Sequence, residues 1–329
     1  MRIKVGIIGG AGYTAGELLR ILLFHPFAEI VFIHSNSNAG NKISSIHQDL
    51  TGDTDMVFTD RLDFSAVDVI FLCLGHGKSV EFMQENEIPE KVRVIDLSQD
   101  FRLQPSFSKG KITREFIYGL PELFRADIQK AWNIANPGCF ATAFQLALLP
   151  LAANGLLKHA VNIHGITGST GAGQSLSQTS HFSWRNNNIS VYKAFTHQHL
   201  KEVRKSLESV SVSDVPALRF IPVRGDFARG IFLTAYTQCD ESLESVLSVY
   251  RDFYKEAAFT FISDLPVHMK QVINTNKCLL QIEKSEDQIL ITSVIDNLTK
   301  GASGQAVQNL NLMFGLDEKT GLRLKPVMF

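Results

Sequence analysis

The chain has 329 residues, of which 45% are hydrophobic and 20% charged, and its formal net charge is −1. This length suffices for two domains with sizeable cores. A net charge near zero, with Lys and Arg scattered along the chain, gives no basic footprint for nucleic acid or a membrane surface. No apolar run reaches the ~20 residues that a membrane span needs, and the start of the chain predicts a strand rather than a signal peptide. We therefore expect a cytoplasmic protein that acts on a small molecule.

Four cysteines are spread along the chain without a C-x-x-C pair, at Cys73, Cys139, Cys239 and Cys278. That spacing argues against a disulfide framework or a structural zinc site, and it is typical of a reducing compartment. Cys73 lies in an apolar run, and Cys239 and Cys278 each border one, which predicts core thiols. Cys139 has a different setting, described below.

The first predicted element is a β-branched strand, Ile3 to Ile8, which ends in Gly9-Gly10-Ala11-Gly12 and leads directly into a helical pattern. Strand, glycine turn and helix are the context of a dinucleotide fingerprint, in which glycines allow a tight turn and close approach of a pyrophosphate. The alternative is a purely structural βα turn. The predicted cofactor-binding residues here are Gly9, Gly12, Tyr13, Thr14 and Ala15.

The second strand, Glu29 to His34, ends at Ser35-Asn36-Ser37-Asn38. An NAD site usually places Asp or Glu near this point to bind the ribose 2′-hydroxyl. Here only hydroxyl and amide groups follow, so a 2′-phosphate would not be repelled. The sequence therefore favours NADP over NAD, with Ser35 and Ser37 as cofactor contacts.

Two further strands are predicted, Val67 to Leu74 and Val92 to Leu97. Strands alternating with helices predict a parallel, doubly wound (Rossmann-like) sheet, whose ligands bind at the carboxyl ends of the strands. Gly75 and His76 follow the first of these strands and join the predicted cofactor contacts. Arg102 lies just beyond the second, where it could bind a phosphate or carboxylate, or form a structural ion pair with Asp100.

A cysteine begins the next helical pattern. A short predicted strand, Trp132 to Ala135, leads into Asn136-Pro137-Gly138-Cys139, and the run from Phe140 to Leu149 is almost entirely apolar or small. This arrangement sets the Cys139 thiol on the first turn of a buried helix, where unpaired N–H groups and the helix dipole favour a thiolate. Cys139 is the predicted nucleophile.

A second domain is predicted to begin at the strand Val161 to Thr167, which enters the small-residue loop Gly168–Gly173. The loop could be flexible filler, or its backbone donors could bind a cofactor or the reacting group. Gly171 and Gly173 of the loop are predicted cofactor contacts, and so is Asn297, which lies far along the chain. The polar and aromatic stretch from Gln174 to Tyr192 lacks periodicity, which is typical of a long functional loop.

His197 and His199 open a helix that is expected to run to about Glu208. An H-x-H pair can ligate metal, but no third ligand stands at a compelling spacing, so we expect no metal. A structural histidine is the simple alternative for each. An acid–base histidine beside a cysteine nucleophile is the sharper hypothesis.

The remaining patterns predict strands in 217–238, 267–273, 277–283 and 288–295, and an amphipathic helix over 241–256. Clustered strands with a long helix predict an α+β domain whose mostly antiparallel sheet is covered by helices on one face. Such a sheet often serves dimerisation, so a homo-oligomer is expected.

Taken together, the motifs resemble those of the N-acetyl-γ-glutamyl-phosphate reductase family of arginine biosynthesis, over most of the chain. The matching stretches are G-G-A-G-Y-T-A-G-E-L-L-R (Gly9 to Arg20), D-L-S-Q-D-F-R (Asp96 to Arg102), Y-G-L-P-E-L (Tyr118 to Leu123), N-P-G-C-F-A-T (Asn136 to Thr142), G-S-T-G-A-G (Gly168 to Gly173) and D-N-L-T-K-G-A-S-G-Q-A-V-Q-N (Asp296 to Asn309).

The resemblance implies NADPH-dependent reduction of an acyl phosphate to an aldehyde, through a thioester on Cys139 with His199 or His197 as acid–base. It also implies a dimer or tetramer, and a C-terminal helix that returns to the nucleotide domain. The expected domains are therefore 1–140 with 300–329 for NADP, and 141–299 for catalysis and oligomerisation. Aspartate-semialdehyde dehydrogenase shares this plan and is the alternative enzyme, and a non-catalytic NADP-binding sensor is the alternative from another class.

The chain departs from the family pattern in two places. Lys201 and Val203 replace the Pro and Ile of the family's histidine motif, which spares both histidines. The family's P-H-L-x-P-M-x-R-G segment reads P-V-R-G-D-F-A-R-G from Pro222 to Gly230, so Arg224 and Arg229 are predicted substrate contacts along with Arg102. Arg224 suggests an acyl group larger or more acidic than acetyl, such as succinyl.

Overall fold

The computed structural model describes residues 2–328, which divide into two compact units. The first unit comprises the chain up to Gly138 together with Ala302–Arg323, and the second comprises Cys139–Gly301 with the residues from Leu324 onward. The sequence had grouped 300–329 as a whole with the nucleotide domain. Each unit is described below by itself.

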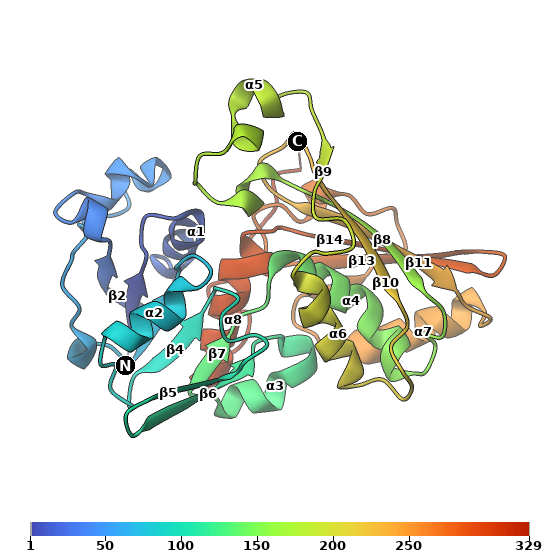
Figure 1. Ribbon diagram of the computed structural model, residues 1–329, viewed down its shortest axis with the longest axis horizontal. Coiled ribbons are helices and arrows are strands. Elements are labelled where there is room, and N and C mark those ends of the chain that lie inside the picture. The colour runs from blue at the N-terminus through green and yellow to red at the C-terminus, as the bar shows by residue number, and fades with distance from the viewer. Residues whose placement is uncertain (1, 329) are drawn as a thin grey trace. The chain divides into compact units, whose positions relative to one another are not determined.

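The first unit is built on a seven-stranded sheet of order β2-β1-β3-β4-β7-β6-β5, drawn mostly in blue and cyan in Figure 1. Every neighbouring pair is parallel except the β5–β6 hairpin, so the predicted doubly wound sheet is confirmed. Its strands are β1 (Ile3–Ile8), β2 (Ala28–His34), β3 (Val69–Leu72), β4 (Arg93–Asp96), β5 (Ser106–Lys109), β6 (Ile112–Tyr118) and β7 (Asn133–Ala135). Its helices are α1 (Tyr13–Leu22), α2 (Lys78–Glu85), α3 (Pro121–Lys130) and α8 (Gly304–Met313).

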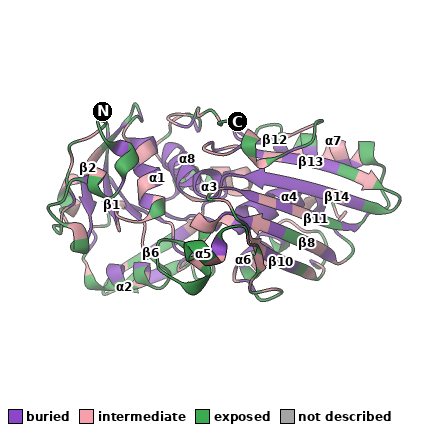
Figure 2. Cartoon of the chain, turned by 90° about the horizontal axis from the view of Figure 1, so that it is seen from above, coloured by how far each residue is buried: buried purple, intermediate pink, exposed green. Residues whose placement is uncertain are grey.

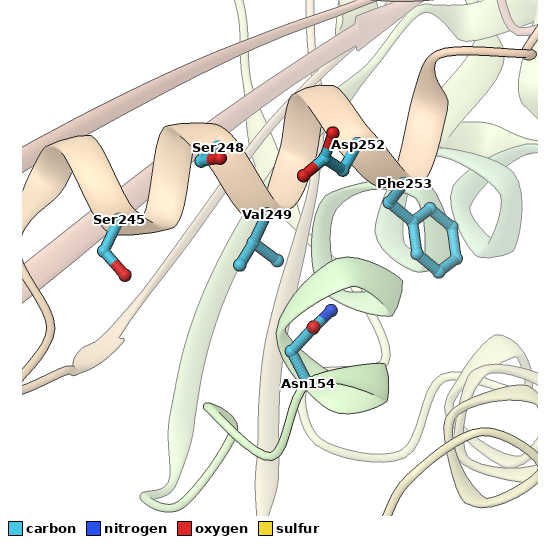
Figure 3. A pocket seen from close by; sticks show the side chains of 6 residues that line it. All are labelled: Asn154, Ser245, Ser248, Val249, Asp252 and Phe253. Atoms are coloured by element: carbon cyan, nitrogen blue, oxygen red, sulfur yellow. The ribbon is translucent and has the colours of Figure 1, made fainter.

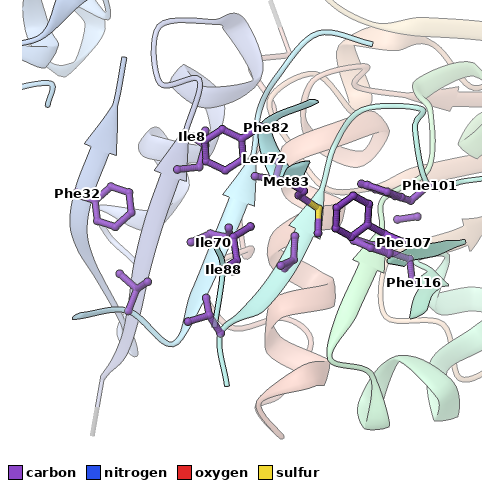
Figure 4. Close-up of a cluster of buried hydrophobic side chains, with 14 residues drawn as sticks. Ile8, Phe32, Ile70, Leu72, Phe82, Met83, Ile88, Phe101, Phe107 and Phe116 are labelled. Atoms are coloured by element: carbon purple, nitrogen blue, oxygen red, sulfur yellow. The ribbon is translucent and has the colours of Figure 1, made fainter. Parts of the chain in front are cut away.

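A cluster of buried side chains forms one core of this unit (Figure 4). Phe101 and Phe116 stack in it with ring centroids 4.0 Å apart, and Phe107 meets Phe101 edge-on. Burying each large aromatic side chain removes on the order of 150 Å² or more from water, which makes these rings a major stabilising contribution. The start of α2 is held to this region by Asp100, whose carboxylate accepts hydrogen bonds from the N–H groups of Gly77, Ser79 and Val80.

Helix α8 comes late in the chain but lies inside the first unit, packed against α1 and α3. All of its residues are buried. Several of its polar side chains form hydrogen bonds within the unit. The Asn309 amide donates to the carbonyl oxygen of Gly119 and to Oδ1 of Asn136, and Oδ1 of Asn311 lies 3.0 Å from Nε2 of His25. A buried helix with this many amides is fixed in register by its partners.

The second unit is built on another seven-stranded sheet, of order β12-β13-β14-β11-β8-β10-β9. Its central pairs are antiparallel and only β8–β10 and β12–β13 are parallel, which confirms the mostly antiparallel prediction. Its strands are β8 (Val161–Thr167), β9 (Ser190–Val191), β10 (Leu218–Arg224), β11 (Ile231–Gln238), β12 (Thr260–Ile262), β13 (Cys278–Ser285) and β14 (Gln288–Ile295). Its helices are α4 (Cys139–Ala153), α5 (Phe182–Arg185), α6 (His199–Glu208) and α7 (Leu243–Tyr254), and the turn Thr299–Ser303 is π-helical.

Helices α4 and α7 pack on one face of this sheet, and α6 packs on α4. Along β11 the burial alternates strictly, with Ile231, Leu233 and Ala235 buried and Tyr236 exposed. The helix-covered face is therefore the core, and the opposite face of β8 and β11 carries partly exposed side chains. Figure 2 colours the chain by burial.

One predicted strand is wrong. Residues 267–273 contain a 3-10 turn, Met269–Gln271, started by a reciprocal pair of hydrogen bonds between His268 and Gln271. Val267 and Val272 are buried against Val294, so their apolar character reflects a small satellite core rather than a strand. The β5–β6 hairpin and β12, in turn, were not predicted, since their short runs carry little alternation.

Candidate active site

Cys139 is the first residue of α4, as the sequence predicted, and it is partly exposed while the rest of the helix is almost wholly buried. Two glycines allow this position. A Cβ added to Gly301 would lie 2.8 Å from Cβ of Cys139, and one added to Gly165 would lie 2.4 Å from the ring of Phe140. Both contacts are too short for any side chain, so the start of α4 rests against bare backbone on two sides.

The two predicted histidines lie close to the start of α4. The His197 ring meets the ring of Phe140 edge-on, with centroids 5.7 Å apart, and lies 4.7 Å from the ring of His199. His199 is the first residue of α6 and is 7% exposed. The structure therefore brings the starts of α4 and α6 together and places both histidines beside the residue that follows Cys139.

His197 is fixed as a neutral ring. Its Nδ1 accepts a hydrogen bond from the N–H of His199 at 3.3 Å, which leaves the proton on Nε2. Burial lowers the pKa of His197 to about 4, and the positive charges of Lys193 and Arg224 add to this effect. A ring that stays neutral at neutral pH is a poor proton donor, so His197 is better suited to orienting its neighbours.

Tyr192 and Arg224 complete this group. The Arg224 guanidinium lies over the Tyr192 ring, 4.6 Å from its centroid. The centroids of the Tyr192 and His197 rings are 5.7 Å apart. Burial raises the pKa of Tyr192 to about 12; Cys139 adds to the rise and Arg224 opposes it. The phenol is therefore a neutral hydrogen-bond donor close to the thiol. Nε of Arg224 is buried and has no hydrogen-bond partner among residues 2–328.

Arg229 and Asn297, two further predicted site residues, belong to a polar cluster around Asp296. Arg229 donates from Nε and Nη2 to the two carboxylate oxygens of Asp296, both at 3.0 Å. Asn297 is 2% exposed; its Oδ1 accepts from the N–H of Gly230 and its Nδ2 donates to Oγ1 of Thr170. Their predicted contacts with substrate and cofactor stay predictions.

The loop Gly168–Gly173 is ordered by neighbouring backbone rather than left as filler. Thr170 donates from its N–H and its Oγ1 to the carbonyl oxygen of Ala228, and a Cβ on Gly168 would lie 2.4 Å from that same oxygen. Gly171 and Gly173 lie at the far side of this turn, and Gly173 has a φ of +75° that favours glycine. Whether they contact the cofactor stays a prediction.

In the first unit, the predicted glycine turn has the geometry that a dinucleotide requires. Gly9 has a φ of +80°, and a Cβ there would lie 2.7 Å from the carbonyl oxygen of Cys73. Gly12 precedes α1, and a Cβ there would meet only the Gly9 oxygen at 3.9 Å. No side chain caps α1, and its first turn, which includes Tyr13, Thr14 and Ala15, carries no acidic residue. This open, uncapped helix start suits a pyrophosphate.

The remaining predicted cofactor residues lie at carboxyl ends of the same sheet. Ser35 is buried and follows β2, while Ser37 is exposed; the hydroxyl of each accepts a hydrogen bond from the Asn38 amide. Gly75 and His76 follow β3 and are both exposed. These positions fit the predicted NADP site, which remains untested at the level of single residues.

Arg102 has a setting that its sequence position did not predict. The side chain is 5% exposed, and it donates from Nε to the carbonyl oxygen of Asn136 at 2.8 Å and from Nη2 to that of Leu97 at 3.0 Å. Arg102 therefore braces the turn that leads to Cys139. Its predicted role as a substrate ligand stays a prediction.

Sequence reasoning missed several residues of the second unit: Tyr192, Asp296 and the two glycines that touch the start of α4. Tyr192 stands in a stretch that was recognised as functional, but no local spacing singles it out. Asp296 and Gly301 stand in the C-terminal motif, which does not indicate their partners. Only the fold supplies those partners.

Metal binding and membrane insertion concern other features of residues 2–328. No three His, Cys, Asp or Glu side chains in this range are grouped to hold a metal ion, and none of its helices is long and apolar enough to cross a membrane. Figure 3 shows a hollow of about 540 Å³ along α7, lined by Ser245, Ser248, Val249, Asp252, Phe253 and Asn154. Asn154 follows the last residue of α4, at the opposite end of that helix from Cys139, so this hollow is separate from the thiol.

Two family models match the chain in agreement with its two units. The semialdehyde dehydrogenase, NAD binding domain, matches residues 4–131, and the semialdehyde dehydrogenase, dimerisation domain, matches residues 139–297. The fold and the cysteine at the start of the second match thus define the class of protein as a semialdehyde dehydrogenase.

Curated relatives narrow this class. The N-acetyl-gamma-glutamyl-phosphate reductase of Flavobacterium johnsoniae is 57% identical over 328 residues, which are 99% of this chain and 100% of that protein. The reductase of the same name from Christiangramia forsetii is 55% identical over 327 residues, again 99% and 100% of the two chains. The chain belongs to the N-acetyl-γ-glutamyl-phosphate reductase family, and it is an oxidoreductase. The family resemblance inferred from the motifs is confirmed.

Solved structures agree on the fold. An aspartate semialdehyde dehydrogenase II complexed with ASA, from Vibrio cholerae, has a TM-score of 0.69 at 17% identity, covering 96% of this chain and 99% of that one. An aspartate semialdehyde dehydrogenase with NADP, from Candida albicans, has a TM-score of 0.70 at 14% identity, covering 95% and 99%. At these identities the comparison shows a shared fold.

Proposed function

We propose that this protein catalyses the NADPH-dependent reduction of an N-acyl-γ-glutamyl phosphate to the N-acyl-glutamate 5-semialdehyde, with release of phosphate, in arginine biosynthesis. The observation that carries the proposal is Cys139 at the start of α4, beside two histidines and Tyr192. The relatives' shared name supplies the substrate class.

The first step uses groups of the second unit. The Cys139 thiolate attacks the γ-carbonyl carbon, a C–S bond forms, and the C–O bond to phosphate breaks, leaving a thioester. The dipole of α4 favours a thiolate at its first residue. The Tyr192 phenol is neutral and close to the thiol. It is proposed to donate a hydrogen bond to the carbonyl oxygen, on which negative charge develops during the attack.

The second step needs a hydride and a proton. NADPH, when bound at the glycine turn, supplies the hydride that reduces the thioester. His199 donates a proton to the carbonyl oxygen to give a thiohemiacetal, and then takes that proton back as the C–S bond breaks, which frees the aldehyde and restores the thiolate. His197 holds the start of α6 through its bond to the His199 N–H.

The residues that would hold NADPH are those of the first unit. The N–H groups of Tyr13, Thr14 and Ala15, at the uncapped start of α1, are assigned to the pyrophosphate. Ser35 and Ser37 are assigned to the 2′-phosphate, and Gly75 and His76 to the edge of the sheet next to them. Gly171, Gly173 and Asn297 are the contacts assigned in the second unit.

The chemistry is tested with Cys139→Ser. We expect turnover to fall by about 10³-fold or more, because serine cannot form the thiolate that starts the reaction. The phosphate-dependent reduction of NADP by N-acyl-glutamate semialdehydes measures the activity in reverse, and aspartate semialdehyde serves as the competing substrate. Intact activity in Cys139→Ser, or a preference for aspartate semialdehyde, would contradict the proposal; no activity on any semialdehyde would favour a non-catalytic NADP-binding sensor.

The acyl group is proposed to carry a carboxylate, as in succinyl. The Arg224 guanidinium lies beside Tyr192 and acts electrostatically on His197, and its buried Nε has no acceptor among the described residues. A carboxylate would supply that acceptor in a charge-assisted hydrogen bond. Arg102 is kept as a proposed contact of the phosphate or the glutamyl part.

Substrates with acetyl and succinyl groups decide this point. For Arg224→Gln we expect kcat/KM on the succinyl substrate to fall about 10- to 100-fold, the value of a hydrogen bond to a charged group, and kcat/KM on the acetyl substrate to change little. Arg219→Gln is the matched control, since Arg219 is exposed on the same strand, β10. A clear preference of the wild type for acetyl would exclude an acidic acyl group.

The protein is further proposed to work in the cytoplasm as a homo-oligomer, a dimer or tetramer. All four cysteines are thiols rather than disulfides within residues 2–328, which suits a reducing compartment. A match to a dimerisation domain supports self-association through the second unit.

A further inference from the structure

Asp296 is a fully buried carboxylate at the end of β14. Its Oδ1 accepts hydrogen bonds from the N–H groups of Leu298 and Thr299, at 2.8 and 2.9 Å, and its Oδ2 accepts from the N–H of Asn274 at 2.7 Å. A single side chain therefore holds both the turn that follows β14 and the separate segment at Asn274. Carboxylates bound by several N–H groups in this way are strong, directional anchors.

Arg229 completes the anchor. Its guanidinium forms a two-pronged pair with Asp296 and also donates from Nη2 to Oγ1 of Thr299 at 3.1 Å. The segment just before β11, where Arg229 lies, is thereby tied to the same turn. A buried ion pair of this kind gives little net stability, since the cost of desolvating both charges offsets their attraction, so its geometric effect is the more informative one.

The anchored turn contacts Cys139 through Gly301. The backbone oxygen of Asp296 accepts from the N–H of Gly301 at 2.9 Å, which closes the turn. The Cα of Gly301 then lies so close to Cys139 that an added Cβ would come within 2.8 Å of the Cys139 Cβ. The position of Gly301 therefore limits where the Cys139 side chain can lie.

We propose that the Arg229–Asp296 pair positions the Cys139 thiol, by fixing the turn 298–301 whose glycine packs against it. This inference rests on Cys139 being the nucleophile of the proposed function. It gives Arg229 a role through Asp296 rather than through direct contact with substrate, and it makes Asp296 a positioning residue.

The test compares Asp296→Asn and Arg229→Lys with the wild type. Asn keeps one acceptor oxygen but sets an NH₂ group against the donors of Arg229 or Asn274. Lys keeps the charge of Arg229 but loses the planar guanidinium that donates two parallel hydrogen bonds. The first readout is the rate at which iodoacetamide alkylates Cys139, followed by mass spectrometry of the peptide that contains it. This readout needs no substrate. The second is the separation of kcat from KM in the reductase assay.

We expect both variants to alkylate Cys139 about 10-fold or more slowly and to lose kcat in proportion, with KM within about twofold of the wild type, because a misplaced thiol reacts poorly with any electrophile. Arg251→Gln is the matched control. It breaks the exposed Arg251–Asp264 pair of the same unit and should leave both readouts unchanged.

The outcomes separate the competing roles. Wild-type alkylation with a raised KM in Arg229→Lys would overturn the inference and make Arg229 a substrate ligand. Wild-type values of both readouts in both variants would also overturn it. If Asp296→Asn does not fold, Arg229→Lys alone decides, since Arg229 is partly exposed. Failure of the proposed function appears elsewhere, as intact turnover in Cys139→Ser.

Discussion

His197 and His199 stand two residues apart, yet their surroundings suit them to different work. His197 is enclosed by Phe140, Tyr192 and Phe220, and its Nδ1 is engaged by the backbone of His199. His199 starts α6, where its ring adjoins that of His197. This difference is the reason for proposing His199 as the acid–base group and His197 as the residue that holds it in place, a distinction that the H-x-H spacing alone does not provide.

The depressed pKa of His197 makes the stability of the protein depend on pH. Between pH 6.5 and about 4 the unfolded imidazole binds a proton that the folded one does not, so the free energy of unfolding should fall as pH is lowered through that window. The contribution is at most about 3 kcal/mol for a shift of this size. Urea unfolding of wild type and His197→Gln, measured from pH 7 to 4, should show a shallower fall in the variant.

His164→Gln serves as the control for that series, since His164 is an exposed histidine of the same unit. It should follow the wild-type curve. Equal pH dependence in wild type and His197→Gln would show that the His197 ring does not remain neutral in the folded protein.

At the scale of elements, the position of Cys139 depends on how closely α4 approaches β8. Phe140 lies over Gly165 of β8, whose absent side chain provides the space. The sequence shows Gly165 only as a small residue inside an apolar strand, where glycine is otherwise unfavourable.

Gly165→Ala should therefore lower the reactivity of Cys139 as well as the stability of the protein. An added Cβ would meet the Phe140 ring at 2.4 Å and the Phe220 ring at 3.0 Å, so we expect a loss of about 1–3 kcal/mol of stability from overpacking. Because Phe140 follows Cys139, alkylation of Cys139 should slow as well. Thermal unfolding and the alkylation assay measure the two effects.

Gly110→Ala is the comparison for that variant. Gly110 lies in the β5–β6 turn with open space around it, so its change tests only the backbone cost of a positive φ. Loss of stability without any change in Cys139 alkylation in Gly165→Ala would show that α4 accommodates the shift away from its first turn.

At the scale of the whole molecule, the open face of the second sheet is the predicted site of self-association. Ile166, Phe232 and Tyr236 project from β8 and β11 on the face away from α4, and none of them is fully buried. Partly exposed apolar side chains on a sheet face are typical of an oligomer interface.

Tyr236→Glu should weaken that association. Tyr236 is 38% exposed in the single chain, and a carboxylate placed opposite another copy would be desolvated without a partner. We expect sedimentation equilibrium at micromolar concentration to shift from dimer or tetramer toward monomer. Leu265→Glu, at a more exposed position of the same unit, should not change the distribution. An unchanged assembly in Tyr236→Glu would place the interface elsewhere.

The sequence predicted those parts of the fold and site that depend on residues close together in the chain. Apolar runs ending in glycine gave the parallel strands, and the Pro-Gly pair before an apolar run placed Cys139 at the start of a helix. It did not give the pairs that join distant segments. Arg229 and Asp296 lie 67 positions apart, and neither residue type indicates the other. Arg102 was likewise read as a ligand from its place beyond a strand, while its buried contacts with Leu97 and Asn136 depend on the packed fold.

Helix α8 adds a constraint on the order of folding. It is buried within the first unit, yet it is synthesised only after Cys139–Gly301, the main part of the second unit. Until α8 has been made, the side of α1 and α3 that it covers stays exposed to water. The first unit therefore cannot complete its core until most of the second unit has been synthesised, so chaperone dependence during synthesis should centre on the N-terminal half.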